Sequence, residues 1–191
     1  PQRLARTARN MRRARLALEA AVDRFLTAHA FVDPHGYAGI GKPGLLEADE
    51  ELALRMVTRL LQLVSGGDYP YRLDRLEDLV AALRSETPPG PRTLGGCRIE
   101  TRAGDILVFR EVSAIGPAVP AQTALFWDRR FSLELSGDLT GVTVGALGAE
   151  GVRQARAAGL ADVGFEQVPG PARATLPGLW RDGGVIAIPC L

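Results

Sequence analysis

The sequence contains few of the residues that disulfide-rich, metal-binding or membrane folds require. Two cysteines, Cys97 and Cys190, are too few for a disulfide scaffold or a cysteine-rich zinc site, so we expect reduced thiols. His29 and His35 alone cannot complete the ligand shell of zinc, so we expect no metal site. No apolar run approaches the roughly 20 residues that cross a bilayer, and nothing resembles a signal peptide. These absences favour a cytoplasmic protein with no membrane partner.

Arginine supplies nearly all of the positive charge, because Lys42 is the one lysine among 23 basic residues. The net charge of +1 conceals a gradient along the chain. Residues 1–15 contain six arginines and no acid, whereas the remainder contains 17 basic and 22 acidic residues. A guanidinium binds phosphate with a planar, two-pronged fork. A GC-rich genome also favours arginine, so the composition alone does not establish nucleic-acid binding.

The chain otherwise has the composition of an ordinary folded protein, with 46% hydrophobic and 24% charged residues. Its 191 residues suit one domain or two small ones. No catalytic constellation emerges, because both histidines lie far in sequence from the cysteines and no nucleophile is paired with a base. Because the chain begins with Pro1 rather than Met, we expect that an upstream part has been removed.

Residues 2–28 have the periodicity of an amphipathic helix. One stripe at about 100° per residue is apolar, and it comprises Leu4, Ala8, Met11, Leu18, Val22, Phe25 and Leu26. Arginines at positions 3, 6, 9, 12 and 13 spread over the opposite side. Such a helix either lies along RNA phosphates, where each neutralised phosphate releases counterions, or presents a solvated face that confers solubility. The sequence leaves both interpretations open.

Two further helices are predicted before residue 88. The first spans Leu45–Val64 and ends at Ser65-Gly-Gly-Asp68, where glycine suits a left-handed helix cap. The second begins near Pro70, continues to Leu83 and ends before the prolines of Thr87-Pro-Pro-Gly-Pro91. Because the loops between these helices are short, we expect antiparallel packing around a small apolar core.

Beyond Pro91 the period changes from helix to strand. Cys97–Arg102 and Ile106–Arg110 flank a turn and predict a β-hairpin. Residues 127–135 alternate apolar and polar side chains, which predicts one half-buried strand and places Arg129 and Arg130 on opposite faces of it. Three more elements are predicted, namely a strand at Val142–Val144, a helix at Gly151–Leu160 and a mostly buried strand at Gly184–Pro189.

These elements predict an α+β fold. An antiparallel helical segment at residues 1–87 is followed by a small mixed, mainly antiparallel α+β unit at residues 88–191. The helical segment includes the basic first helix, and the second unit contains the strands. There is no internal repeat or low-complexity tract.

Three motifs occur in a characteristic order. Asp33-Pro-His-Gly-Tyr37 is a turn by composition, Thr93-Leu-Gly-Gly-Cys-Arg98 opens the predicted hairpin, and Arg173-Ala-Thr-Leu-Pro-Gly-Leu-Trp180 lies near the end of the chain. Together they resemble the C-terminal region of bacterial tRNA(Ile)-lysidine synthases, which belong to the PP-loop family. The resemblance covers nearly the whole chain. It implies a parent enzyme that uses ATP to ligate lysine to the wobble cytidine, C34, of tRNA(Ile).

The catalytic signature of that family is missing. Its catalytic domain carries a Ser-Gly-Gly-x-Asp-Ser phosphate loop, and Ser65-Gly-Gly-Asp68 matches only part of this pattern. The segment follows a predicted helix, whereas a phosphate loop follows a strand and opens a helix. It is more similar to the family's Gly-Gly-x-x-Tyr-Pro loop between helices. We therefore assign no catalytic residue and no cofactor to this chain. The resemblance implies ATP with Mg²⁺, and lysine, as ligands of the parent enzyme's N-terminal PP-loop domain.

The resemblance implies that this half of the enzyme recognises and positions tRNA. Seven arginines are candidate contacts, namely Arg6, Arg9, Arg13, Arg130, Arg153, Arg156 and Arg173. Arg173 matches an arginine in the family's Pro-x-x-x-Arg-x-x-x-Pro stretch, and a structural ion pair is its alternative role. Arg153 and Arg156 lie three apart on a predicted helix, although the preceding Ala149-Glu150 departs from a denser basic stretch in the family.

Two tryptophans, Trp127 and Trp180, either stack on exposed bases or pack in the core, and core packing is favoured. The expected partners are tRNA(Ile) and the N-terminal PP-loop domain of the parent chain. The alternative function is a non-enzymatic protein-interaction or dimerisation module, whose partner could be a second copy of the chain.

Overall fold

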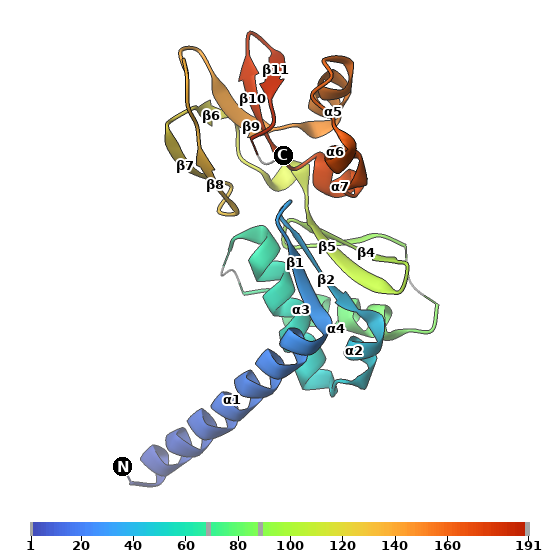
Figure 1. Ribbon diagram of the computed structural model, residues 1–191. Coiled ribbons are helices and arrows are strands. Elements are labelled where there is room, and N and C mark those ends of the chain that lie inside the picture. The colour runs from blue at the N-terminus through green and yellow to red at the C-terminus, as the bar shows by residue number, and fades with distance from the viewer. Residues whose placement is uncertain (1, 68–69, 88–89, 190–191) are drawn as a thin grey trace.

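The computed structural model describes residues 2–67, 70–87 and 90–189, and the fold is α+β, as predicted. Cys190, predicted to be a reduced thiol, lies outside the described residues. Figure 1 shows two units joined by a single passage of chain after strand β5. We call residues 2–110 the first unit and residues 112–189 the second unit. Each unit has its own apolar core.

The first unit is built on a five-stranded antiparallel sheet with the order β1-β2-β5-β4-β3. The strands are β1 (Ala30–Asp33), β2 (Tyr37–Gly41), β3 (Arg92–Leu94), β4 (Cys97–Arg102) and β5 (Asp105–Arg110). The predicted hairpin is confirmed as β4 and β5. Its turn holds Ala103 and Gly104 at positive φ, the geometry of a two-residue hairpin loop.

Four helices belong to the first unit, namely α1 (Gln2–His29), α2 (Lys42–Glu47), α3 (Glu50–Ser65) and α4 (Leu73–Arg84). Helix α3 packs against the sheet and against α1 and α4. Its apolar face, which includes Met56, Leu60 and Leu61, is buried in the core. Gly66 caps α3 in the left-handed conformation, as the sequence predicted, whereas Asp68 of the same segment lies outside the described residues.

The predicted helix at residues 45–64 is in fact two helices. Ala48 and Asp49 have extended backbones, so the chain breaks between α2 and α3. The acidic residues Glu50 and Glu51 then occupy the first turn of α3, where carboxylates interact favourably with the helix dipole. The third predicted helix begins at Leu73 rather than near Pro70, and the prolines at 88 and 89 lie outside the described residues.

The second unit contains a four-stranded antiparallel sheet with the order β11-β10-β9-β6. Its strands are β6 (Val119–Pro120), β9 (Thr143–Ala146), β10 (Pro177–Arg181) and β11 (Gly184–Ala187). A separate hairpin pairs β7 (Ala124–Trp127) with β8 (Phe131–Glu134). The helices are a 3₁₀ turn at Val112–Ala114, α5 (Gly148–Ala157), α6 (Val163–Gln167) and α7 (Gly170–Arg173).

The prediction of one strand over residues 127–135 is wrong. Asp128 and Arg129 adopt positive φ, so the chain reverses there and β7 pairs with β8. Burial alternates as expected along Phe131–Leu135, which follows the turn. The last strand, β11, is also less buried than predicted, because Ile186 is exposed on this edge strand.

The first core draws residues from both sides of residue 88. Cys97, Ile99, Ile106 and Val108 pack with residues of α1, α3 and α4. The strands β1 and β2, which the sequence did not predict, join the helical segment to β5 and so to the β4–β5 hairpin. The domain boundary between residues 87 and 88 therefore stays a prediction. The first apolar core extends past this boundary and ends with β5.

Candidate nucleic-acid interface

The N-terminal half of α1 projects away from the rest of the chain (Figure 1). Every residue from 2 to 17 is exposed, whereas Val22 is fully buried farther along the same helix. The apolar stripe predicted for the whole helix is therefore covered only in its second half. Leu4 and Met11 are 79% and 69% exposed.

Arg6, Arg9 and Arg13 occupy one face of this projecting segment. Their spacing of three and four residues brings them together on a helix, over a length of about 10 Å at 1.5 Å per residue. Among the described residues, none of the three forms a salt bridge. Arg13 donates one hydrogen bond to the Asn10 side chain, which carries no charge. The three positive charges are thus presented to solvent without an acidic partner.

Acidic residues appear in α1 only where the helix joins the body. Glu19 accepts hydrogen bonds from Arg55 and Arg59 of α3, and Asp23 accepts one from Arg59. The hydrogen bond from Arg59 is the main reason that the pKa of Glu19 lies below its usual value. These ion pairs attach the second half of α1 to α3, so they fix the direction in which the arginine-bearing half points.

The candidate arginines of the second unit are paired with acids. Arg153 donates two hydrogen bonds to Glu150, three residues earlier on α5. Arg156 donates from Nε and Nη2 to the two carboxylate oxygens of Glu166, at 2.7 and 2.9 Å. Arg173 donates to the same carboxylate. The hydrogen bond from Arg156 is the main cause that lowers the pKa of Glu166 to about 2, so this carboxylate is ionised at any physiological pH.

The structure therefore brings Arg156 and Arg173 together around Glu166 and leaves Arg153 in a separate pair. Arg173 is 17% exposed, and its guanidinium also lies 5.7 Å from the centre of the Phe165 ring. The structural ion pair that the sequence allowed for Arg173 is present. Each of these charges is compensated locally, unlike those on the first half of α1.

Arg130 is placed in the interior. Its side chain is 3% exposed, and its guanidinium donates to Asp128 and to the backbone carbonyls of Gly36 and Thr175. Burial is the main cause that lowers its pKa, although Asp128 opposes the shift. With these three acceptors occupied, the side chain presents no face to a phosphate at the surface.

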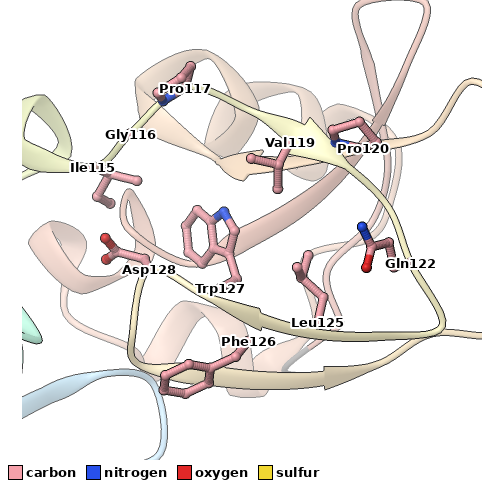
Figure 2. A pocket seen from close by; sticks show the side chains of 10 residues that line it. All are labelled: Ile115, Gly116, Pro117, Val119, Pro120, Gln122, Leu125, Phe126, Trp127 and Asp128. Carbon is pink, nitrogen blue, oxygen red and sulfur yellow. The ribbon is translucent and has the colours of Figure 1, made fainter.

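Trp127 and Trp180 pack within the second unit. Trp127 is 4% exposed and Trp180 is half-buried, with its indole N–H donating to the carbonyl of Gly145. Figure 2 shows Trp127 pointing into a pocket of about 430 Å³ between β7 and residues 115–120. Apolar side chains dominate its lining, including Ile115, Val119 and Leu125. This lining suits a hydrophobic group rather than a phosphate.

Two side chains of chemically reactive types, Cys97 and His35, lie in the first unit. Cys97 is buried, and burial raises the pKa of its thiol to about 12, so it stays protonated at neutral pH. His35 lies in the predicted turn, where its backbone N–H and its imidazole ring form hydrogen bonds with the Asp33 carboxylate rather than with a nucleophile. Residues 2–67, 70–87 and 90–189 contain no cluster of three or more His, Cys, Asp or Glu side chains suited to a metal ion. None of the helices formed by those residues combines the length and the hydrophobicity that a membrane span requires.

Two acids that decide how these arginines behave escaped the sequence reasoning. Glu166 lies ten residues after Arg156 and seven before Arg173, and the three residues belong to three different helices, so no spacing within one helix links them. Asp128 was assigned to a strand face, yet it occupies a turn. The Asp128-Arg-Arg130 run beside an aromatic residue could have signalled a turn, because Asp tolerates the left-handed region better than most residues.

The chain is similar to tRNA(Ile)-lysidine synthases, in one of them over almost its whole length. It is 31% identical over 195 residues to the tRNA(Ile)-lysidine synthase of Ruegeria pomeroyi, a match that covers 98% of this chain and 42% of that protein. The proteins of the same name from Methylobacterium nodulans and Anaplasma marginale are 38% and 26% identical, over 57% and 70% of this chain and 34% and 29% of their own lengths. The chain thus spans less than half the length of these relatives. No family model matches it. The predicted resemblance is confirmed.

Proposed function

We propose that this chain, a relative of part of the tRNA(Ile)-lysidine synthases, is the tRNA-recognition half of such an enzyme. In this proposal it positions tRNA(Ile) in the cytoplasm. A PP-loop domain elsewhere in the parent protein uses ATP, with Mg²⁺, to ligate lysine to the wobble cytidine. In this proposal the PP-loop domain carries out the chemistry, and this chain contributes binding and orientation.

The observation that carries this proposal is the arginine face of α1. Six arginines and no acid occur among residues 1–15, and Arg6, Arg9 and Arg13 share one exposed ridge. A ridge of unpaired guanidinium groups suits a polyanion, because each contact to a phosphate releases condensed counterions. The ion pairs of Glu19 and Asp23 with α3 attach the helix to the body, so phosphates bound there are held at a defined place.

A protein-interaction or dimerisation module is the second candidate, and the exposed Leu4 and Met11 favour it. Two copies that paired through this part of α1 would each bring six positive charges to the contact. Like charges oppose such pairing at low salt, so the arginines favour an acidic partner over a second copy. Sedimentation at rising protein concentration separates the two candidates. A dimer that forms at low salt and whose mass tRNA does not change contradicts the proposed function.

The direct test is the salt dependence of tRNA(Ile) binding, measured by fluorescence anisotropy with the 191-residue chain. The variant carries Arg6→Gln, Arg9→Gln and Arg13→Gln. If all three contact phosphate, the slope of log affinity against log salt becomes shallower by about 2 to 3, at 0.7 to 0.9 for each contact.

The matched control carries Arg72→Gln, Arg75→Gln and Arg102→Gln, which remove the same charge from exposed positions elsewhere in the first unit. If the α1 ridge binds the RNA, the control should keep a slope close to that of the unsubstituted 191-residue chain. An equal loss of slope in both variants would mean that net charge alone, and not the α1 ridge, attracts the RNA.

A further inference from the structure

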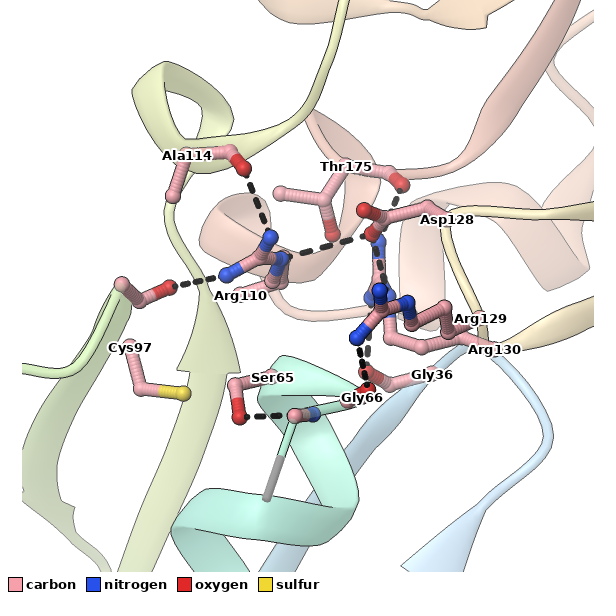
Figure 3. A network of polar contacts seen from close by, with 12 residues as sticks. Gly36, Ser65, Gly66, Cys97, Arg110, Ala114, Asp128, Arg129, Arg130 and Thr175 are labelled. Atoms are coloured by element: carbon pink, nitrogen blue, oxygen red, sulfur yellow. Dashed lines mark hydrogen bonds and ion pairs between the residues drawn. The ribbon is translucent and has the colours of Figure 1, made fainter. Parts of the chain in front are cut away.

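The turn between β7 and β8 is strained and points at the first unit. Asp128 and Arg129 have φ values of 47° and 56°, in the left-handed region that non-glycine residues seldom adopt. Such conformations persist only where the surroundings hold them in place. The contacts that hold this turn come largely from the other unit, as Figure 3 shows.

Arg130 connects the two units with one side chain. Its Nη1 donates to the carbonyl of Gly36 in the first unit at 2.9 Å, and its Nη2 donates to the carbonyl of Thr175 in the second unit at 3.1 Å. Its Nε donates to Asp128 at 2.8 Å. The planar guanidinium fork reaches all three acceptors at once, which the single ammonium of lysine could not do.

Asp128 is shared with a second arginine. Arg110, at the end of β5 in the first unit, lies 3.4 Å from the Asp128 carboxylate and also donates to the carbonyls of Gly96 and Ala114. Arg110 and Asp128 are 11% and 8% exposed. The result is a buried Arg–Asp–Arg cluster whose members come from both units. Because an unpaired buried charge is costly, each member depends on the others staying in place.

The first unit has glycine at two positions where the turn approaches it. A Cβ at Gly36 would lie 2.5 Å from the Phe131 ring and 2.8 Å from Nη1 of Arg130. A Cβ at Gly66 would lie 2.6 Å from the Cβ of Arg129, whose guanidinium donates to the carbonyl of Gly66. The absence of a side chain at these two positions thus leaves room for the turn against the backbone of the first unit.

An apolar contact runs beside the cluster. Leu107 and Phe109 of β5 pack with Val168 and Ala172 of the second unit, and Tyr37 packs against them. Apolar burial holds the units together, but it is non-directional. The charged cluster adds direction, because its hydrogen bonds are satisfied in only one relative orientation of the units.

We propose that Asp128 and Arg130 are positioning residues that fix the second unit in one orientation on the first. The Asp33-Pro-His-Gly-Tyr37 turn acts as the socket for Arg130, through the carbonyl of Gly36. This inference rests on the proposed function: the joint holds the α1 arginine ridge in a set direction from the second unit, so an RNA molecule bound to the ridge meets the second unit in a fixed register.

The test measures the distance between the units by double electron–electron resonance, without RNA, on the 191-residue chain. Nitroxide labels are placed at Glu77→Cys in α4 and Ala157→Cys in α5, both exposed positions, in a Cys190→Ser background. Cys97 is buried and stays unlabelled. We expect one narrow distribution of the distance between the labels in this doubly labelled chain without further substitutions.

Arg130→Met removes the three hydrogen bonds while keeping an unbranched apolar stem, and we expect a clearly broader distribution with an unchanged circular dichroism spectrum. Asp128→Asn keeps the shape of the side chain, removes the charge and is expected to broaden the distribution less. Arg153→Met makes the same substitution at an exposed arginine away from the joint and should leave the distribution unchanged.

A broad distribution in the parent overturns the proposal, and that measurement requires no variant at the joint to fold. A folded Arg130→Met or Asp128→Asn variant whose distance distribution is as narrow as that of the labelled chain without these substitutions also overturns the proposal. Because no RNA is present, these outcomes are independent of whether the chain binds tRNA. A rigid joint in a chain that fails the tRNA test would leave the joint standing and remove only its proposed use.

Discussion

Substituting Glu166 by glutamine is expected to strengthen the binding of RNA to the second unit. The carboxylate of Glu166 accepts two hydrogen bonds from Arg156 and another from Arg173. Glutamine keeps one acceptor oxygen and a similar shape but removes the negative charge. Two guanidinium groups that are compensated in the parent chain then become available to phosphates.

The size of the effect follows from counterion release. If both arginines gain a phosphate contact, the slope of log affinity against log salt steepens by about 1.4 to 1.8, and if one does, by about half of that. Acidification cannot reproduce this effect. The pKa of Glu166 is lowered to about 2, so its pairing is complete above its ordinary value of 4.5 and is lost only as the pH falls through about 2. Between pH 5 and 8 the slope of log affinity against log salt should therefore stay constant for the unsubstituted chain.

The assay is anisotropy with tRNA(Ile) at four or more salt concentrations, and Glu150→Gln is the control. Among the described residues, Glu150 forms an ion pair with Arg153 and also accepts a hydrogen bond from Gln154. This variant therefore makes the same change in net charge at a neighbouring exposed site but releases one arginine rather than two. The reasoning is refuted if Glu166→Gln steepens the slope no more than Glu150→Gln, or if it weakens binding in a variant that remains folded.

Three further predictions concern the interior. Gly36→Ala should lower the free energy of unfolding by about 2–5 kcal/mol in urea titrations, since it combines a left-handed alanine with overpacking against Phe131. Gly104→Ala, at positive φ in open space, should cost only the first part, about 1–2 kcal/mol, and equal losses would contradict the close approach. The Cys97 thiol, with its pKa raised to about 12 by burial, should react with a thiol reagent at pH 8 only after unfolding, in a Cys190→Ser background. Burial, and next the influence of the Asp33 carboxylate, raises the pKa of Tyr37 to about 12. Asp33→Asn should therefore lower the pH at which the phenolate absorbance of Tyr37 appears, and an unchanged titration would argue against that influence.

The elements that the sequence predicts well are those with a strong local period. Helix α1, the β4–β5 hairpin and the short helix α5 follow from spacing and turn residues alone. Strands β1 and β2 were missed because each has at most five residues, and their apolar side chains follow a helix without a change of composition. The pairing of β2 with β5, more than sixty residues later, is a tertiary contact that local pattern does not encode.

In the candidate site, too, local sequence predicts some features, whereas tertiary packing determines others. Sequence position identified the arginines but not their partners, because an ion pair is set by the packing of separate elements. Arg130 illustrates this most clearly. The residue was a reasonable candidate contact in a strand, yet the reversal at Asp128 and Arg129 turns it into the interior, toward Gly36. The arginines on α1 kept their predicted exposure because, from residue 2 to residue 17, that half of the helix has no buried side chain.

The exposed half of α1 has a thermodynamic consequence. Over residues 2–17 the helix is supported by its own backbone hydrogen bonds and by no buried side chain. Short helices without tertiary contacts open readily, so amide protons there exchange with solvent far faster than those near Val22. A polyanion that binds the folded helix more tightly than the unfolded segment stabilises the helix against opening. Slower exchange in this segment then records binding directly, at the residues that make the contact.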